Sequence, residues 1–483
     1  MGGDKEGAQS VAAMDGGRLD LAALRPDLRD AVQSIAAIAK ESGGRAMMVG
    51  GAVRDLASGG VGVKDVDIEV FGVEPHRLRD AISRKFAFDE CGVSFGVLKI
   101  KHMDIDVALP RRESKCGTGH RGFLVDSDPW MSMKDAASRR DFTVNAMYCD
   151  PFTGEVEDPY GGMEDLRNRT LRHVSGKFSE DPLRVLRGMQ FVSRFGLRAA
   201  RETVEVCRRM SIENLPPERI FGEFTKMLVK GREIGAGLEF LRSTGWVCYF
   251  PELWALTRCR QDPEWHSEGS VWNHTCLCLD AFAKSRIGDP CEDLIVGLAV
   301  LCHDFGKPAT TRFEDGHVRS RGHDEAGVAP TLSFLRRLTN EERILREVPP
   351  LVKCHMQPFA LYRANVGDSA IRRLALRVVR IDRLIRVARA DMDGSIPVAK
   401  ADSKMDGALD WLAAQAERLR VAAAAPKPLL QGRHLIDMGY APSEKFGKWL
   451  SLAFEAQIAG RFSDIDGAKA YFKANIGSQN PSA

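Results

Sequence analysis

The chain has 483 residues, of which 44% are hydrophobic and 28% are charged, and this length exceeds one ordinary domain. No run of 18 apolar residues occurs, which argues against a membrane-spanning helix, and a net charge of +3 means that any nucleic-acid partner needs a local basic face. The 11 cysteines are scattered without a paired Cys-x-x-Cys pattern, which is typical of reduced thiols in a cytoplasmic protein.

In chain order, the first elements are a tail and a small sheet. Residues 1–19 are rich in glycine, alanine and polar residues and lack the apolar core of a secretory signal, so we expect a disordered tail. Residues 20–42 show the apolar spacing of a helix. Short apolar runs then alternate with turns, which predicts a small mixed sheet with a few helices; the runs are 46–49, 66–71, 97–100 and 105–109.

A glycine pair followed by two close acids carries the most information in this region. Gly50 and Gly51 open a turn that a large ligand can approach, and Asp65 and Asp67 follow in an apolar, β-branched run. Residues two apart in a strand share a face, so the two carboxylates repel each other unless a cation lies between them. Oxygen ligands favour Mg²⁺ or Mn²⁺, which handle phosphates. The alternative is a pair of solvated acids at a strand edge.

The next strand offers a third carboxylate. Asp104 and Asp106 would share one face, and we favour Asp106, with a salt-bridged strand acid as the alternative. Residues 111–130 are rich in glycine, serine and charge, which predicts a mobile loop. Further on, Arg140 carries a guanidinium that can hold a phosphate through several fixed donors. Asp141 and Asn145 offer hydrogen-bonding groups for a ribose hydroxyl.

After residue 162 amphipathic helical patterns dominate, and the segment 179–187 is the most discriminating. Asp181 and Arg184 are three residues apart and share a helical face. Cytosine and adenine each present an amino donor beside a ring-nitrogen acceptor, which complements an aspartate and an arginine. Uracil and guanine present the reverse, so this pair would accept C and A and reject U and G. A surface ion pair is the alternative.

Separate helices of the second half carry imidazoles and carboxylates in the ordered set His274, His303, Asp304, His323, His355 and Asp391. Such ligands, brought together from different helices, make a divalent-metal site. The alternative is a fold kept for packing or for support of RNA.

These motifs resemble those of the class II transfer-RNA nucleotidyltransferases (CCA-adding enzymes) and their bacterial poly(A) polymerase relatives. The matching segments are GGAVRD from residue 50, KDVDIEVFG from 64, RRDFTVNA from 139 and EDPLR from 180. The resemblance implies that Gly50 and Gly51 bind the triphosphate, that Arg54 belongs to the nucleotide-binding residues, and that Asp65 and Asp67 hold the metal ions. It also implies that Asp181 and Arg184 read the base, with Glu180 steering them, and that Arg187 is a further nucleotide-binding residue.

The histidine and aspartate set resembles the HD-type phosphohydrolase domain of some bacterial CCA-adding enzymes, which implies metal binding by His274, His303, Asp304 and Asp391. The last segment resembles the C-terminal tail of class II enzymes. Its Lys445 and Lys448 could contact transfer-RNA phosphates, although a merely solvated helix face is equally consistent.

The resemblance implies an α+β protein with a polymerase-β-like head that contains a small mixed sheet, followed by an all-helical neck, HD-like body and tail. The expected domains are a head over 20–158, a neck with base recognition over 159–250, an HD-like domain over 251–400 and an RNA-binding tail over 401–483.

The expected reaction adds CCA to the 3′ end of transfer RNA from CTP and ATP, with two Mg²⁺ ions in the head and release of pyrophosphate. A second, phosphohydrolase activity would use Ni²⁺, Mn²⁺ or Co²⁺ in the HD-like domain. The alternatives are a poly(A) polymerase, a partial CC- or A-adding enzyme, or an HD phosphohydrolase with an RNA-binding head. We expect a cytoplasmic monomer or homodimer that binds transfer RNA and no membrane.

Overall fold

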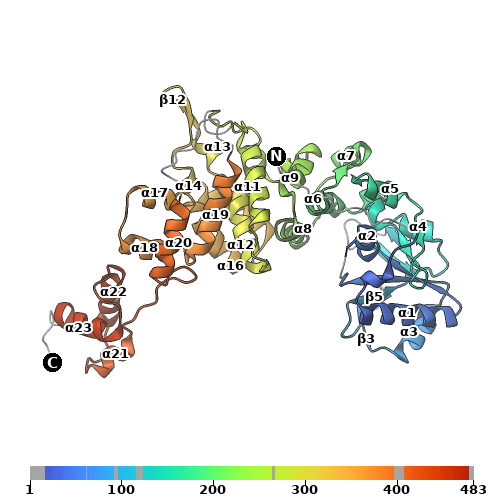
Figure 1. Ribbon diagram of the computed structural model, residues 1–483, viewed down its shortest axis with the longest axis horizontal. Helices are drawn as coiled ribbons and strands as arrows, with labels where there is room; N and C mark the ends of the chain where they lie inside the picture. Colours follow the sequence, from blue (N-terminus) through green and yellow to red (C-terminus); the bar gives the residue numbers. More distant parts are fainter. Residues whose placement is uncertain are drawn as a thin grey trace, which may run out of the picture. The chain divides into compact units, whose positions relative to one another are not determined.

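A computed structural model of the protein describes residues 17–60, 63–91, 96–115, 123–263, 267–395 and 407–477 (Figure 1). The chain divides into two compact units. The first comprises Met1–Met227 and Ala236–Trp246, and the second comprises Leu228–Gly235 and Val247–Ala483. Among the described residues, every helix is too short or too polar to cross a membrane.

The first unit is built on a seven-stranded sheet with the order β3-β4-β5-β2-β1-β8-β9. Only β2 and β5 pair in parallel; the other neighbours are antiparallel, which confirms the predicted small mixed sheet. The strands are β1 (Arg45–Val49), β2 (Val66–Phe71), β3 (Phe88–Cys91), β4 (Val97–Ile100), β5 (Ile105–Ala108), β8 (Tyr148–Cys149) and β9 (Val156–Glu157).

Helices cover this sheet. The predicted N-terminal helix is present as α1 (Pro26–Glu41), where Pro26 is compatible with the first turn and the apolar positions Leu28, Val32 and Ile35 are buried at helical spacing. It packs against β1 and against α3 (Pro75–Ser83) (Figure 1). Short helices α2 (Gly51–Ala57) and α4 (Met133–Ala137) and the 3₁₀ helices Leu21–Ala23 and Thr143–Asn145 complete the head.

The expected loop over 111–130 is wrong for its two arms. Strands β6 (Arg111–Lys115) and β7 (Phe123–Ser127) form an antiparallel ribbon, and residues 116–122 between them lie outside the described residues. Backbone hydrogen bonds hold a two-stranded ribbon together, and the side-chain pattern of a charge-rich segment does not reveal them.

The segment that follows the sheet is mainly helical, with one correction to the expected all-helical neck. Strands β10 (Thr170–Leu171) and β11 (Arg198–Ala199) pair in parallel. Each has only two residues, too short for a periodic strand signal. The helices are α5 (Gly162–Arg167), the 3₁₀ helix Gly176–Glu180, α6 (Leu183–Phe195), α7 (Arg201–Arg208), α8 (Pro217–Lys230), α9 (Ile234–Ser243) and the 3₁₀ helix Trp246–Tyr249.

The second unit is a helical body around α12 (Pro290–Cys302), whose residues from Ile295 to Cys302 are all buried. A helix that is apolar all round belongs in a core. Helices α11 (Val271–Lys284), α16 (Glu342–Cys354) and α19 (Ile381–Gly394) pack on it. The other helices are α10 (Pro251–Leu256), α13 (Lys307–Thr310), α14 (His323–Ala326), α15 (Val328–Leu338), α17 (Gln357–Arg363), α18 (Asp368–Val378) and α20 (Ala408–Arg418).

A hairpin of β12 (Arg312–Glu314) and β13 (His317–Arg319) interrupts the helices of this body, so here too the all-helical expectation needs correction. Below it, a buried ion-pair network joins α12, α16 and α19. Arg383, 3% exposed, donates to Glu292 at 2.6 and 2.7 Å and to Glu347 at 2.6 Å. The hydrogen bonds from Arg383 lower the pKa of Glu292 to about 2.

The C-terminal segment contains α21 (Gly432–Asp437), α22 (Lys445–Ile458) and α23 (Ile465–Asn475). These helices share a cluster of their own, with Leu435 and Phe472 fully buried and several aromatic rings around them. Lys445 and Lys448 are exposed on α22, where they remain available to a ligand.

Candidate nucleotide and metal sites

The head contains a polar pocket of about 340 Å³ beside the parallel strands β2 and β5. Asp67 and Asp106 line it and occupy opposite positions in the register of these strands, so their carboxylates project side by side. Guanidinium groups and one further acid complete the charged lining: Arg111, Arg139, Arg140, Arg184 and Glu69. Close carboxylates suit a divalent cation and surrounding arginines suit phosphates, so this lining fits a metal–triphosphate.

The electrostatics of Asp67 reflect this crowding. Loss of surrounding water raises the pKa of Asp67, Arg140 lowers it, and the charges of Asp106 and Asp65 raise it again, so the pKa lies above its ordinary value. Asp106 has a partial counter-charge in Lys99, whose Nζ is 3.4 Å from the carboxylate. Asp65 lies just before β2 and is exposed. A cation among these carboxylates would relieve their repulsion.

The glycine turn lies against the same groups. Gly50 has φ 71° and ψ −132°, a conformation that side chains disfavour. A Cβ there would lie 3.3 Å from Asp67 Oδ2 and 3.3 Å from Arg140 Nη1. Gly51 follows as the first residue of α2. The turn therefore needs glycine both for its backbone and for the close approach of an acid and a guanidinium.

Three predicted nucleotide-binding residues form a buried chain. Arg54, 5% exposed, donates from Nη1 to Asn145 Oδ1 at 2.7 Å, and Asn145 Nδ2 donates to Asp141 at 3.0 Å. Asp141 in turn accepts from Arg187 Nε at 2.7 Å, and the bonds from Arg187 and Asn145 outweigh burial to lower the pKa of Asp141. Arg54 also lies over the ring of Phe195, 4.2 Å from its centroid. The chain fixes α2 and α6 to the 3₁₀ helix 143–145.

The two predicted base-reading residues each have a partner of their own. Asp181 accepts from Arg219 at 2.9 Å and from the N–H of Leu183, the first residue of α6, at 3.1 Å. Arg184 donates to the carbonyl oxygens of Lys177 and Arg139 at 2.7 and 2.6 Å. Arg184 is thus held at the pocket, and Arg219 on α8 is a partner that short-range spacing could not reveal. Glu180 lies next to them and is exposed.

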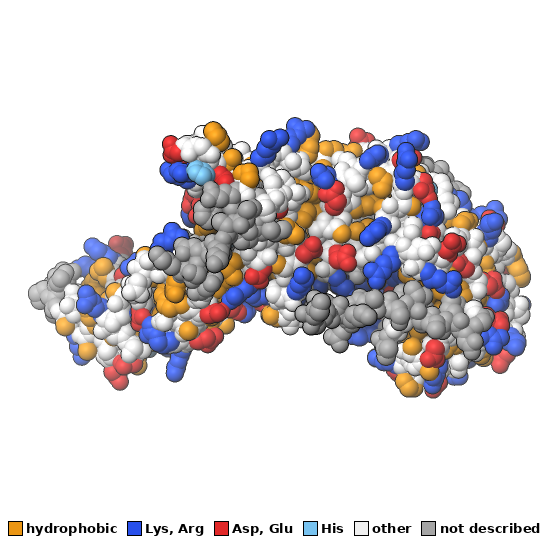
Figure 2. Space-filling view, turned by 45° about the horizontal axis from the view of Figure 1, so that its top comes forward, with side chains coloured by type: hydrophobic (Ala, Val, Ile, Leu, Met, Phe, Trp, Pro, Cys, Tyr) orange, Lys and Arg blue, Asp and Glu red, His pale blue; other side chains and the backbone are white. Residues whose placement is uncertain are grey.

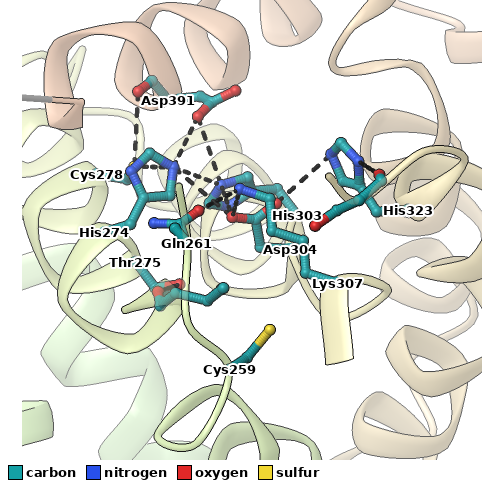
Figure 3. A network of polar contacts seen from close by, with 12 residues as sticks. Cys259, Gln261, His274, Thr275, Cys278, His303, Asp304, Lys307, His323 and Asp391 are labelled. Atoms are coloured by element: carbon teal, nitrogen blue, oxygen red, sulfur yellow. Dashed lines mark hydrogen bonds and ion pairs between the residues drawn. The ribbon is translucent and has the colours of Figure 1, made fainter. Parts of the chain in front are cut away.

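A second cluster lies in the helical body (Figure 3). His274 comes from α11, His303 and Asp304 follow α12, and Asp391 comes from α19. The structure brings all four predicted ligands together: His274 Nε2 is 2.9 Å from Asp391, 3.4 Å from His303 Nε2 and 3.7 Å from Asp304. Asp304 is also 3.6 Å from Nε2 of His323.

The histidines are oriented for ligation by their outer nitrogens. Nδ1 of His303, His323 and His355 lies 2.7, 2.8 and 2.6 Å from a backbone carbonyl, which can only accept, so each Nδ1 carries the proton. Their Nε2 atoms converge, and those of His323 and His355 are 3.2 Å apart. Burial lowers the pKa of His355 to about 4, so its ring is neutral at pH 7. Two such nitrogens need a shared proton or a cation between them.

Asp304 shows the same demand for positive charge. It is 1% exposed, and in the described part of the chain its Oδ1 has no hydrogen-bond donor. Its Oδ2 is 2.7 Å from Nζ of the buried Lys307. Burial lowers the pKa of His303, but Asp304 and Asp391 outweigh this and hold it well above the ordinary value. Protons or metal ions can supply the charge that these acids attract, so the donor set fits a metal.

The sequence motif did not identify two residues that contact this cluster. Cys278 lies one turn after His274 on α11, with its Sγ 3.4 Å from His274 Nε2, and helical i,i+4 spacing could have found it. Glu268, whose side chain is 2% exposed, lies 3.1 Å from His274 Nδ1 and precedes the helix, where no periodic signal exists. The possible ligands form two groups: His274, Cys278, His303 and Asp391, and Asp304, His323 and His355.

The fold and the pocket define a nucleotidyltransferase-type head, and comparison with known proteins identifies its family. Residues 46–172 match the family described as poly A polymerase head domain, and residues 196–257 match the probable RNA and SrmB binding site of polymerase A. A multifunctional CCA protein of Xylella fastidiosa is 37% identical over 302 residues, covering 61% of this chain and 70% of that protein. A multifunctional CCA protein of Stenotrophomonas maltophilia is 34% identical over 371 residues, covering 74% of this chain and 87% of that protein.

The chain belongs to the family of the multifunctional CCA proteins, nucleotidyltransferases that use divalent metal ions. Solved structures agree on the fold. The CCA-adding enzyme of Bacillus stearothermophilus in complex with CTP has a TM-score of 0.64 at 20% identity, covering 94% of this chain and 99% of that one. The Thermotoga maritima CCA-adding enzyme complexed with transfer RNA has a TM-score of 0.58 at 17% identity, covering 94% and 96%.

Proposed function

We propose that the head adds CCA to the 3′ end of transfer RNA, using CTP and ATP and releasing pyrophosphate. The observation that carries this proposal is the pocket in which Asp67 and Asp106 lie side by side among four arginines. Family membership supports it, because relatives that share this head are multifunctional CCA proteins.

Asp65, Asp67 and Asp106 would hold Mg²⁺, which when bound lowers the barrier by neutralising charge on the attacking and leaving oxygens. The remaining work falls to positioning by the chain. Arg140 and the Gly50–Gly51 turn bind the triphosphate, and the chain from Arg54 to Arg187 keeps α6 fixed against the head. No protein nucleophile is required.

Base selection follows from the groups around α6. Arg184, fixed by two carbonyls, presents its donors to the ring-nitrogen acceptor of cytosine or adenine, and Asp181 accepts from the exocyclic amine. Because Arg219 contacts the same carboxylate, we add it as a positioning residue for Asp181. Glu180 would steer this pair. Uracil and guanine would place an acceptor opposite the carboxylate of Asp181 and a donor opposite the guanidinium of Arg184, so both contacts would be unfavourable.

The test gives the purified protein a transfer RNA that lacks its terminus, with each nucleoside triphosphate singly and together, and sequences the products. CCA ends support the proposal. CC or A alone, or a run of A, would identify a partial enzyme or a poly(A) polymerase, and unextended RNA would leave the head as a binding module.

We propose a second activity, hydrolysis of phosphate esters, for the helical body. The converging Nε2 atoms favour it, because imidazoles select softer ions such as Ni²⁺, Mn²⁺ or Co²⁺. A bound metal would lower the pKa of a water and so make a nucleophile. A pocket of about 360 Å³ opens on Asp304, Asp391, His323 and Lys307, and the lysine can hold a phosphate oxygen.

In that reaction water adds to phosphorus, one P–O bond breaks, and the departing oxygen takes a proton. Terminal 2′,3′-cyclic phosphates and phosphomonoesters are apt substrates, because they block the free 3′-hydroxyl that the head needs. The assay is hydrolysis of p-nitrophenyl phosphate and 2′,3′-cyclic AMP across a panel of metals, with His303→Ala and Asp304→Ala as controls. Turnover no higher than in these variants would leave the body as a support for transfer RNA.

We also propose that Lys445 and Lys448 contact transfer-RNA phosphates and that the enzyme acts in the cytoplasm. Both lysines are exposed on one helix, α22. Their joint replacement by alanine should raise KM for transfer RNA and leave KM for the nucleotides unchanged.

A further inference from the structure

A second groove lies beside the metal pocket of the body. It measures about 450 Å³ and is formed by the end of α10 and the hairpin β12–β13. Arg258, Arg260, Arg312 and Phe313 line it, and we call it the arginine groove. All four side chains are exposed, and Phe313 is 76% exposed. On the face shown in Figure 2, lysine and arginine side chains lie interspersed with acidic and hydrophobic ones.

These arginines contribute little to the stability of the fold through ion pairs. Within the described ranges, no carboxylate forms an ion pair with Arg258, Arg260 or Arg312. Among the described residues, Arg312 donates to the neighbouring Thr311 carbonyl alone, and it lies directly opposite Arg319, which pairs with Asp315 at 3.5 Å. Like charges directly opposite destabilise a two-stranded ribbon. Such an arrangement indicates an anionic ligand.

Aromatic surface lies among the same charges. Arg258 lies over the ring of Trp254, 4.3 Å from its centroid, and Trp254 is 40% exposed. Phe313 presents its ring to solvent from the hairpin. Arginines for phosphates and open aromatic faces for bases are the combination that holds single-stranded nucleic acid. An acidic peptide would use the arginines but not the ring faces.

The arginine groove adjoins the metal pocket. Val318 lines both, and the hydroxyls of Thr311 in one and Ser320 in the other are 2.7 Å apart. The buried Asp262 anchors the hairpin between them, accepting from the Val318 N–H at 2.8 Å. A chain lying in the groove therefore has its end close to the pocket.

We propose that the arginine groove binds the last nucleotides of a single-stranded RNA 3′ end and delivers its terminal phosphate to the metal pocket. Arg258 and Arg312 contact backbone phosphates, and Phe313 stacks on a base. This inference rests on the proposed hydrolase, and it makes an RNA end, rather than a free nucleotide, the preferred substrate. Hydrolysis of a terminal cyclic phosphate then consumes one water and leaves a phosphomonoester.

The test compares two substrates in the full-length protein: 2′,3′-cyclic AMP and a ten-nucleotide RNA that ends in a 2′,3′-cyclic phosphate. Replacing Arg258 and Arg312 by alanine should lower kcat/KM for the RNA about tenfold, through KM, and flatten its log–log salt dependence by about 1.4, since each single-strand phosphate contact contributes about 0.7. Phe313→Ala should lower kcat/KM for the RNA about fivefold. Turnover of 2′,3′-cyclic AMP should stay unchanged, and the exposed Arg336 on α15 supplies a matched control, Arg336→Ala.

A second readout does not depend on hydrolysis. A 3′-terminal 4-thiouridine RNA is photo-crosslinked to the metal-free protein, and the attached peptides are mapped. Crosslinks within 254–260 or 311–321, competed by RNA but not by polyglutamate, support the groove. Their absence, equal competition by polyglutamate, or parallel losses on both substrates would overturn it. If the wild type fails to hydrolyse 2′,3′-cyclic AMP, the hydrolase proposal fails. The crosslinks alone then decide whether the arginine groove binds an RNA 3′ end.

Discussion

Asp67→Asn should separate catalysis from stability in the head. The amide keeps the volume of the side chain but removes a charged ligand beside Asp106. Metal stabilisation of the transition state is worth several kcal/mol. A loss of about 4 kcal/mol corresponds to roughly a thousandfold fall in kcat, since each tenfold is about 1.4 kcal/mol.

The same change should not destabilise the metal-free protein. Neighbouring strands are about 5 Å apart, so two ionised carboxylates at Asp67 and Asp106 repel by roughly 1–3 kcal/mol for effective dielectric constants between 80 and 20. The substitution removes this repulsion along with the attraction to Arg140. We therefore expect Tm in chelator to stay level or rise by a few degrees. The wild type should gain further stability from Mg²⁺, which the variant should not.

The assay pairs nucleotide addition to transfer RNA with thermal unfolding, each with and without Mg²⁺. Asp89→Asn supplies the control, because Asp89 is an exposed acid on β3 of the same sheet and pairs with Lys101. Wild-type turnover in Asp67→Asn with unchanged Mg²⁺ dependence would refute the assignment. A marked fall of Tm in chelator would attribute lost activity to unfolding instead.

Three further outcomes are expected. Arg184→Ala and Asp181→Ala should let UTP and GTP compete better with CTP and ATP, since a fitted hydrogen-bond pair is worth about 1–3 kcal/mol of discrimination. Unchanged nucleotide selectivity in both variants would exclude base reading by this pair. Glu268→Ala should weaken metal binding by the body about 10- to 100-fold in calorimetry, because the carboxylate orients His274. Glu292 has its pKa lowered from 4.5 to about 2, so its contribution of about 3 kcal/mol exists above pH 4.5 and fades as pH falls towards 2. Urea unfolding of Glu292→Gln should show that loss at pH 7 and less than half of it near pH 3.

Local patterns predicted most of the elements, and the structure brings the predicted carboxylates of the head together. Alternation in Val66–Phe71 predicts a strand, and the acids around it predict a cation site. The favoured choice of Asp106 over Asp104 gains support from the register, because Asp106 is the residue opposite Asp67. That pairing joins strands far apart in the sequence, and no local spacing reveals it.

Long-range partners were out of reach for the same reason. Asp181 contacts Arg219 across 38 residues, and Arg54 reaches Asn145 across 91. Sequence reasoning assigned Arg54 to nucleotide binding, which stays a prediction; the structure shows it buried, with its guanidinium over Phe195. A buried arginine and a ligand-binding one look alike in a motif, because both need fixed geometry around the same turn.

The chemistry of the two sites gives a reason for their coexistence in one chain. The head offers carboxylate oxygens around an open pocket, whereas the body offers imidazole nitrogens of which His274, His303 and His355 are almost fully buried. With the ions proposed above, hard and softer ions would partition between the sites without competition. Under the proposed functions, each site would act while the other is empty, and the two reactions would connect through the RNA 3′ end. An end that carries a phosphate would serve the body but not the head, and removal of that phosphate would restore the hydroxyl on which nucleotide addition depends.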